Sequence, residues 1–308
     1  MESSGKKKSQ AKPVKATEPL IYINGEFFSK SEAKISVFDH GLLYGDGVFE
    51  GIRSYNCLVF KLKEHLTRLY ESAHTLLLEI PYTLSEMEEI ILETLRVNQL
   101  RDAYIRVVVT RGTGDLGLDP KKCKRATVFV IADKITLYSE KLYREGMTII
   151  TVPTVRNLPE AVNPQVKSLN YLNNILAKIE ANNSGCVEAL MLNHQGYVAE
   201  CTGDNIFIVK NRILMTPPVY VGALEGITRQ AIIDLARRND IPYKEKMMTR
   251  HDVFNADECF LTGTAAEVIP VVGIDGRQIG TGKPGKVTAK LRSAFGDLTR
   301  KDGVRYSI

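Results

Sequence analysis

The order of the strand and helix patterns is the feature of this 308-residue chain that most restricts its fold. Strand patterns come in adjacent pairs, first at residues 20–28 around an Asn24-Gly25 turn, then at residues 48–55 and 58–62. Single helices separate these groups of strands instead of alternating with individual strands. Hairpins mixed with single helices favour an α+β fold over a doubly wound parallel sheet.

Helices are predicted where apolar residues recur at spacings of three and four. The first such stripe is formed by Leu66, Leu69, Ala73 and Leu76. A second helix is expected to run to Leu95 with Ser85 as its N-cap. A third stripe predicts a core helix that ends at Gly185, and it consists of Leu169, Leu172, Leu176 and Ile179.

A polar, charged segment at residues 133–146 marks the expected junction between two domains. The predicted parts of the chain are a tail at 1–18, an N-terminal domain at 19–134, a linker at 135–146 and a C-terminal domain at 147–308. A chain of this length can bury a substantial apolar core in one or two domains.

Much of the formal charge of +5 comes from the tail, which holds five lysines and two glutamates in its eighteen residues. This segment has no apolar run and has the composition of disordered sequence, so we interpret it as a solvated extension. A basic tail can also bind nucleic acid. A nucleic-acid-binding or scaffold protein is therefore the alternative from a different functional class.

Membrane, secretory and metal-binding signals are missing from the sequence. No apolar stretch approaches the ~18 residues of a membrane span, and the tail lacks the apolar core of a signal peptide. The five cysteines are scattered and never spaced as metal-ligand pairs, and the five histidines form no ligand spacing either. We expect a cytoplasmic protein with reduced thiols, no membrane or nucleic-acid partner and no metal site.

Two segments and one arginine could bind an anion such as phosphate. Residues 224–229 run from an irregular stretch into a helix, whose free N–H groups favour a negative charge. Residues 261–267 end a strand in a turn of small residues that can form an anion-binding nest. Taken alone, Thr228 as an N-cap and a plain turn are the simpler interpretations. Arg68 lies between core positions of the first helix and could bind phosphate or pair with a carboxylate.

A lysine and a glutamate are further candidates for chemistry. Lys167 lies in a loop that leads into the predicted core helix, and a lysine there can point into the protein. Burial and nearby cations favour the neutral, nucleophilic form of an amine, although a solvated surface lysine is the commoner case. Glu200 ends a short strand, where a carboxylate could hold a protonated ring nitrogen or simply face solvent.

Four segments carry more information together than apart. They are YGDGVFEGIR (44–53), KSLNY (167–171), GALEGITR (222–229) and GTAAE (263–267). In this order they resemble the class IV, or fold-type IV, pyridoxal-phosphate-dependent aminotransferases, and within them the branched-chain amino acid aminotransferases. The resemblance extends from about Ile21 to Leu298, which is nearly the whole chain without the tail.

The resemblance implies a role for each matching residue. Lys167 matches the lysine that binds the cofactor covalently, and Glu200 matches the acid that pairs with the pyridine nitrogen. The remaining cofactor contacts match a tyrosine, a residue packed on the ring and a phosphate cup, which are Tyr171, Leu224, Arg68, Ile227, Thr228 and Thr264. Groups that hold the substrate match Tyr104, Thr264 and Ala265 for its carboxylate, and Phe49, Tyr44 and Arg106, with Tyr138 as a further candidate, for its side chain.

The resemblance also implies a fold and an activity. The fold is that of D-amino acid aminotransferase-like enzymes, with a smaller N-terminal α/β domain and a larger C-terminal domain that binds pyridoxal 5′-phosphate. The activity is transamination of L-leucine, L-isoleucine and L-valine with 2-oxoglutarate in amino-acid biosynthesis, giving 2-oxo acids and L-glutamate. The partners are then these small molecules and further copies of the chain, in a homodimer or higher homo-oligomer.

Some residues leave other reactions on the same scaffold open. Phe38-Asp39-His40-Gly41 is similar to the D-amino acid branch, and so is the KSLNY segment, which is one residue shorter than in some branched-chain members. Cys201 stands where a glycine is common after the paired glutamate. The alternatives are a D-amino acid aminotransferase, an (R)-amine transaminase or an enzyme of the aminodeoxychorismate-lyase type.

Overall fold

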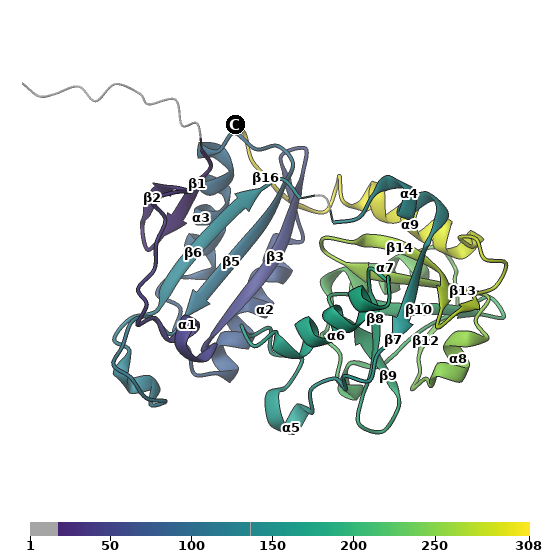
Figure 1. The fold of residues 1–308 in the computed structure, drawn as a ribbon. Coiled ribbons are helices and arrows are strands. Elements are labelled where there is room, and N and C mark those ends of the chain that lie inside the picture. The colour runs from purple at the N-terminus through teal and green to yellow at the C-terminus, as the bar shows by residue number, and fades with distance from the viewer. Residues whose placement is uncertain (1–17, 136) are drawn as a thin grey trace, which may run out of the picture.

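The computed structural model describes residues 18–135 and 137–308, so the predicted tail at residues 1–18 lies outside the described residues except for Glu18. The described chain forms two halves, each built on a β-sheet with helices against it (Figure 1). Each sheet contains hairpins, and single helices connect its parts. The α+β prediction is therefore confirmed.

The N-terminal half is built on a seven-stranded sheet with the order β16-β4-β3-β5-β6-β1-β2, and all its neighbouring strands run antiparallel. The predicted turn at Asn24-Gly25 joins the first hairpin, with φ angles of 49° and 105°. Its strands are β1 (Leu20–Ile23), β2 (Glu26–Ser29), β3 (Gly47–Tyr55), β4 (Leu58–Phe60), β5 (Ala103–Thr110), β6 (Thr127–Asp133) and β16 (Gly303–Arg305).

Helices α2 (Leu62–Thr75) and α3 (Leu84–Val97) cover one face of this sheet, and the short α1 (His40–Tyr44) precedes β3. The predicted stripe of α2 lies in the core with both helices and the sheet. The prediction of Ser85 as the cap of α3 was wrong. Thr83 is the N-cap, because its side chain accepts from the Glu86 N–H while the Glu86 carboxylate bonds the Thr83 N–H at 2.7 Å.

The C-terminal half is built on a mixed nine-stranded sheet with the order β12-β11-β10-β13-β14-β7-β8-β9, in which β15 also pairs with β14. Its strands are β7 (Met147–Thr151), β8 (Ala189–Leu192), β9 (Val198–Cys201), β10 (Asn205–Lys210), β11 (Ile213–Thr216), β12 (Tyr243–Glu245), β13 (Glu258–Gly263), β14 (Glu267–Ile274) and β15 (Arg277–Gln278). The parallel pairs are β7 with β8, β7 with β14, and β11 with β12.

Helices and short turns complete the C-terminal half. The helices are α4 (Glu140–Glu145), α5 (Pro159–Val162), α6 (Leu172–Asn183), α7 (Ile227–Arg238), α8 (Arg250–Phe254) and α9 (Lys286–Leu298). A 3-10 turn, η2 (Val219–Val221), also lies in this half, and another, η1 (Pro120–Lys122), lies in the N-terminal half. Helices α7 and α9 pack on the sheet around a core that includes Ile232, Phe260 and Leu291. No helix in the described ranges is long and apolar enough to cross a membrane.

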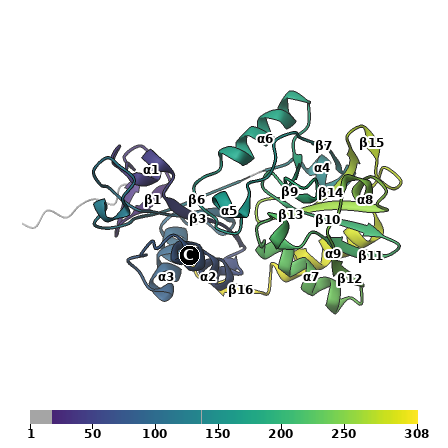
Figure 2. The same ribbon diagram turned by 90° about the horizontal axis from the view of Figure 1, so that it is seen from below.

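The prediction that the apolar stripe of α6 lies in the core was wrong. The stripe expected in the core is exposed, with Leu172 73%, Leu176 53% and Ile179 48% accessible. The side of α6 that faces the sheet is instead made of Asn174, Ala177 and Ala181. Small residues on that side let the helix lie close to β8, and the larger apolar residues then point away from the chain. In Figure 2, α6 stands at the outer edge near the junction of the two halves.

The two halves are joined by more than the polypeptide between them. The last strand, β16, returns to pair with β4, so the end of the chain belongs to the N-terminal sheet. Across the junction, Arg53 pairs with Glu267 at 2.8 Å and the Tyr55 hydroxyl donates to the same carboxylate at 3.0 Å. An isolated bridge between Val48 and Ser168 ties β3 to the segment before α6. These contacts align the residues that meet at the junction.

Candidate active site

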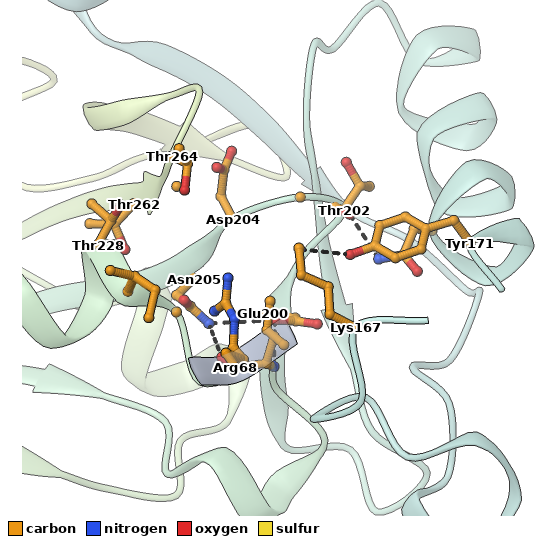
Figure 3. A pocket seen from close by; sticks show the side chains of 16 residues that line it. Arg68, Lys167, Tyr171, Glu200, Thr202, Asp204, Asn205, Thr228, Thr262 and Thr264 are labelled. Atoms are coloured by element: carbon orange, nitrogen blue, oxygen red, sulfur yellow. Dashed lines mark hydrogen bonds between the residues drawn. The ribbon is translucent and has the colours of Figure 1, made fainter. Parts of the chain in front are cut away.

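A cavity at the junction is lined by polar side chains from both halves (Figure 3). Arg68 comes from α2, Lys167 from the segment before α6, Glu200 from β9 and Thr262 from β13. A second compartment of about 260 Å³ opens beside the first, and Lys167 lines both of them. The predicted residues therefore converge from distant parts of the sequence on one place.

Lys167 is half-buried between the two compartments. Its backbone is fixed from the N-terminal half, because its carbonyl accepts from the Phe49 N–H at 3.0 Å and its N–H donates to the Ser72 hydroxyl at 3.2 Å. Its Nζ donates to the Tyr171 hydroxyl at 3.2 Å (Figure 3). The same Nζ lies 4.6 Å from the centre of the Phe49 ring. This amine is thus held inside the protein next to a phenol, as an amine that reacts with a ligand must be.

Glu200 is 5% exposed at the end of β9 and faces the first compartment. One carboxylate oxygen accepts from Arg156 Nε at 2.8 Å. The other accepts from the Leu224 N–H at 2.9 Å and the Asn205 amide at 3.4 Å. The carboxylate therefore lies in a fixed plane at the bottom of the cavity.

Arg68 is held by a buried cluster on α2 and β3. Its guanidinium contacts both oxygens of Glu50, at 2.6 and 2.9 Å, and donates to the Glu225 carbonyl at 2.7 Å. His65 Nδ1 lies 2.8 Å from the same carboxylate. Burial would raise the pKa of Glu50, but the Arg68 charge and these hydrogen bonds outweigh it and hold the pKa well below its usual value. Burial also lowers the pKa of His65.

An anion cradle faces Arg68 across the first compartment. Helix α7 starts at Ile227 behind Gly226, which cannot offer a side-chain cap, so its first N–H groups remain for a ligand. A Cβ on Gly226 would lie 2.0 Å from the Asn205 side chain, which explains the glycine. Thr228 and Thr264 line the same space, the first from α7 and the second from the turn between β13 and β14 (Figure 3).

Thr262 adds a hydroxyl from the segment 261–267, which the sequence offered as a possible anion-binding turn, although the family resemblance gave this residue no role of its own. It is 1% exposed, lines the cradle, and its Oγ1 finds no hydrogen-bond partner within residues 18–135 and 137–308. A buried hydroxyl without a partner costs roughly 1–3 kcal/mol, so a bound acceptor would relieve it. An uncapped helix start, a buried arginine and this hydroxyl together fit a phosphate group.

The second compartment combines apolar and cationic walls. The Arg106 guanidinium carbon lies 3.4 Å from the centre of the Phe49 ring, and Tyr104 and Ala265 line the same space. A Cβ on Gly51 would be 2.2 Å from the Tyr104 hydroxyl, so glycine is needed there for this tyrosine to reach the cavity. Such a space suits a small organic molecule with an apolar part and a carboxylate.

Tyr44 and Tyr138, both predicted to contact the substrate side chain, differ in whether they line the cavity. Tyr44 is not among the residues that line either compartment in the described chain, and its hydroxyl accepts from the Gly117 N–H at 2.8 Å. Its role stays a prediction. Tyr138 does line the second compartment and is 8% exposed, with its hydroxyl 3.4 Å from Glu188 and 3.5 Å from Asp204. Burial and the Glu188 carboxylate raise the pKa of Asp204 to about 8.

The other predicted site residues meet around this cavity. The first compartment is lined by Arg68, Lys167, Tyr171, Glu200, Leu224, Ile227, Thr228 and Thr264. The second is lined by Phe49, Tyr104, Arg106, Thr264 and Ala265, besides Lys167 and Tyr171. Sequence reasoning gave no role to Glu50, Gly51, Arg156 or Asn205. Glu50 and Gly51 lie within the family segment 44–53, whereas no pattern in the sequence around Arg156 points to a role.

The side chains around the cavity indicate a class of protein. A lysine amine beside a phenol, a fixed carboxylate and a phosphate cradle surround a cavity that continues into a small-molecule compartment. They suit an enzyme that holds a phosphorylated aromatic cofactor through its lysine and acts on a carboxylate-bearing substrate. In the described ranges no group of three or more His, Cys, Asp or Glu side chains could hold a metal ion.

Comparison with known proteins identifies the class more closely. The sequence profile described as "Amino-transferase class IV" matches residues 47–274. The chain is 56% identical to a putative branched-chain-amino-acid aminotransferase of Methanocaldococcus jannaschii over 92% of this chain and 98% of that protein. It is 35% identical to a D-alanine aminotransferase of Bacillus licheniformis over 89% of this chain and 95% of that protein.

A solved structure agrees with these sequence relatives. The branched-chain amino acid aminotransferase from T.th., solved with pyridoxamine 5′-phosphate, superposes with a TM-score of 0.89 at 40% identity, covering 93% of this chain and 96% of that one. The chain belongs to the class IV aminotransferase family. Enzymes of this class use pyridoxal 5′-phosphate, and the phosphate cradle, Lys167 and Glu200 fit that cofactor.

Proposed function

We propose that this aminotransferase moves the amino group of L-leucine, L-isoleucine and L-valine to 2-oxoglutarate, giving the branched 2-oxo acids and L-glutamate. Pyridoxal 5′-phosphate bound through Lys167 is the proposed cofactor. The observation that carries the proposal is a second compartment in which Phe49 and Arg106 stand in contact, 3.4 Å from guanidinium carbon to ring centre. That wall suits both an apolar side chain and a carboxylate.

The residues of the first compartment are assigned to the cofactor. Arg68, Thr228, Thr262 and Thr264, with the N–H groups at the start of α7, would hold its phosphate. Glu200 would face the ring nitrogen, Tyr171 the phenolic oxygen and Leu224 one face of the ring. When bound, the cofactor supplies an aldehyde carbon and an aromatic ring that withdraws electrons from the substrate Cα.

The protein contributes proton transfer and orientation. Lys167 Nζ lies at the border of the two compartments, so it can act as the general base that takes the proton from the substrate Cα. The Tyr171 hydroxyl, 3.2 Å from that amine, can share its proton and keep it aligned. Tyr104 and the turn at Thr264 and Ala265 would hold the substrate α-carboxylate.

One pocket must accept two kinds of side chain in the two halves of the reaction. Phe49 offers apolar contact to leucine, isoleucine or valine. Arg106 offers charge-assisted hydrogen bonds to the γ-carboxylate of glutamate or 2-oxoglutarate. The likeness to branched-chain aminotransferases at 56% and 40% identity supports this choice over D-amino acids, for which the likeness is 35%.

We further propose that the enzyme acts as a cytoplasmic homodimer. Support for a dimer comes from α6, whose Leu172, Ile175, Leu176 and Ile179 are 48% to 73% exposed on one face. Leu116 and Leu118, 62% and 80% exposed, add a second apolar surface on the loop before η1. Support for the cytoplasm comes from the five cysteines, all of which are described and free.

A coupled assay tests the proposed reaction. L-Leucine, D-alanine and (R)-1-phenylethylamine are offered as donors, each with 2-oxoglutarate and with pyruvate as acceptors. The proposal predicts fast turnover of L-leucine with 2-oxoglutarate. Preference for D-alanine or for the amine would overturn the substrate assignment while keeping the cofactor site, and a product of lyase chemistry would overturn the reaction type.

An absorbance spectrum tests the alternative that the chain is a nucleic-acid-binding protein and not an enzyme. Protein purified with pyridoxal phosphate should absorb near ~400 nm through the bound cofactor. A colourless protein that binds RNA in a salt-dependent manner would favour a nucleic-acid-binding role for the chain instead.

A further inference from the structure

Arg156 is a buried cation to which the proposed function assigns no role. It lies between β7 and α5, is 6% exposed, and is not among the residues that line either compartment in the described chain. Its main-chain N–H donates to the Leu192 carbonyl at 2.9 Å, which fixes the backbone at this point. A guanidinium this deeply buried needs anionic or polar partners on several sides.

Its partners form a network that ends at Glu200. Nε donates to the Glu200 carboxylate at 2.8 Å, and Nη1 donates to Asn173 at 3.0 Å and to Asn174 at 3.3 Å. Both asparagines lie in the first turn of α6 and are themselves held. Asn173 donates to the Val155 carbonyl at 2.7 Å, and Asn174 donates to the Thr202 carbonyl at 2.8 Å. The guanidinium therefore has little freedom to turn.

The other side of Glu200 is equally constrained. Its second oxygen accepts from the Leu224 N–H at 2.9 Å, and the Asn205 amide that lies 3.4 Å away also donates to the Leu224 carbonyl at 2.9 Å. Arg156 is thus the only full charge paired with this carboxylate among the described ion pairs. Arg156 therefore supplies the countercharge to the Glu200 carboxylate.

We propose that Arg156 is a positioning residue, which acts on the cofactor only through Glu200 by fixing and charge-balancing the carboxylate that faces the ring nitrogen. The inference rests on the proposed function. Without the guanidinium, Glu200 would be an uncompensated buried charge that is free to rotate. The charge-assisted hydrogen bond to the ring nitrogen would then be lost, whereas the phosphate cradle and Lys167 would remain.

If Arg156 acts through Glu200, replacing it should weaken the binding only of ligands that have the ring nitrogen. Arg156→Gln should weaken binding of pyridoxal 5′-phosphate to the apoprotein by roughly 10- to 100-fold, the range of one hydrogen bond to a charged group. Binding of 1-deazapyridoxal phosphate, in which a CH replaces the ring nitrogen, should change by less than about threefold. A merely structural role of Arg156 would weaken both ligands equally.

The experiment measures equilibrium binding of both ligands to the apoproteins of the wild type, Arg156→Gln, Arg156→Lys, Glu200→Gln and the double variant Arg156→Gln/Glu200→Gln. Arg156→Lys keeps the charge but cannot reach Asn173, Asn174 and Glu200 at once, so its selective loss should be intermediate. In the Glu200→Gln background, Arg156→Gln should cause no further selective loss. Arg111→Gln is the matched control, because Arg111 is also largely buried and bonds Asp46 away from the cavity.

Each outcome decides the proposal. A loss confined to pyridoxal phosphate that disappears in the Glu200→Gln background supports it. Equal losses for both ligands, or a selective loss that persists without Glu200, overturn it. If Arg156→Gln fails to fold, an unchanged ratio of the two affinities in Arg156→Lys overturns it as well. A wild type that binds neither ligand contradicts the proposed function itself, and is thereby distinguished from failure of this inference.

Discussion

Among single residues, Arg106 is the side chain to which the proposed function assigns the use of two unlike substrates. Its guanidinium stacks on Phe49, so the apolar and the cationic part of the wall form one surface. Sequence reasoning could assign this residue only through the family resemblance, since one arginine in a strand is uninformative. The contact with Phe49 results from register, because Phe49 pairs with Val108 and Gly51 with Arg106 on adjacent strands.

Replacing Arg106 by Met should separate the two half-reactions. The methionine keeps apolar contact but cannot bind a carboxylate, so KM for glutamate and 2-oxoglutarate should rise at least about tenfold, and KM for leucine far less. Steady-state kinetics with each substrate check this. The control is Arg125→Met, an exposed arginine just before β6. Equal losses for glutamate and leucine would contradict the role given to Arg106.

Glu50 illustrates a residue whose importance only the packing reveals. It was part of a recognised motif, yet nothing in the sequence says that it meets His65 and Arg68 in the core. In a strand, alternate side chains point to opposite faces, and Glu50 points towards α2. There it holds the guanidinium by two oxygens, so that the orientation of Arg68, which is proposed to bind phosphate, is set before a ligand arrives.

Glu50→Gln should destabilise the protein by roughly 3–5 kcal/mol at neutral pH, as removal of one partner of a buried ion pair does. The pKa of Glu50 is lowered in the folded state, so its contribution is present above its usual value of 4.5 and is lost as the pH falls further. The gap in melting temperature between the wild type and the variant should therefore narrow below about pH 4.5. A gap that stays constant from pH 7 to pH 3 would contradict this account.

Among the secondary-structure elements, α6 shows where pattern reasoning is incomplete. The stripe of leucines and isoleucines correctly predicted a helix, because period and residue type determine that choice. It could not tell which partner covers the stripe. The small residues on the opposite side of α6 lie against the chain's own sheet, and the apolar stripe remains open. The cap of α3 was missed for a local reason, since Thr83 and Ser85 both suit an N-cap and each is followed three residues later by a glutamate, Glu86 or Glu88.

If a second copy covers the stripe of α6, a charge placed there should separate the dimer. Leu176→Glu should lower the mass in solution to that of one chain, because a carboxylate cannot be buried in an apolar contact without a partner. Light scattering after size-exclusion chromatography measures this mass. Ser85→Glu, exposed on α3 and outside the stripe of α6, is the control that should leave the mass unchanged. A wild type that already has the mass of one chain would contradict the dimer proposal.

For the whole molecule, the sequence predicted the α+β arrangement, but not the path of the last residues. Strand β16 lies next to β4, far away in the sequence, and no periodicity in three residues could announce that pairing. Tyr306 follows this strand and is 8% exposed, with its hydroxyl 2.8 Å from that of Ser54 and 2.6 Å from the Leu100 carbonyl. The end of the chain thus stabilises the half that carries Phe49 and Arg106.

Tyr306→Phe should lower the stability of the N-terminal half by roughly 1–3 kcal/mol, because it leaves the buried Ser54 hydroxyl with one partner fewer. That loss corresponds to a fall of several degrees in the melting temperature of a protein of this size. Scanning calorimetry of the variant and of Ser307→Ala, an exposed neighbour, measures it. A melting temperature equal to that of the wild type would show that the C-terminal segment does not support this half.

Pyridoxal phosphate is proposed to bind in this cavity through Lys167. The most direct test is to reduce the purified protein, loaded with pyridoxal phosphate, with sodium borohydride, which fixes the cofactor to the lysine that holds it, and then to locate the label by peptide mass spectrometry. The account predicts a single phosphopyridoxyl group on Lys167 in the wild type and no label at that peptide in Lys167→Ala. A label on another lysine, or a loaded protein in which Lys167 stays unmodified, would contradict it.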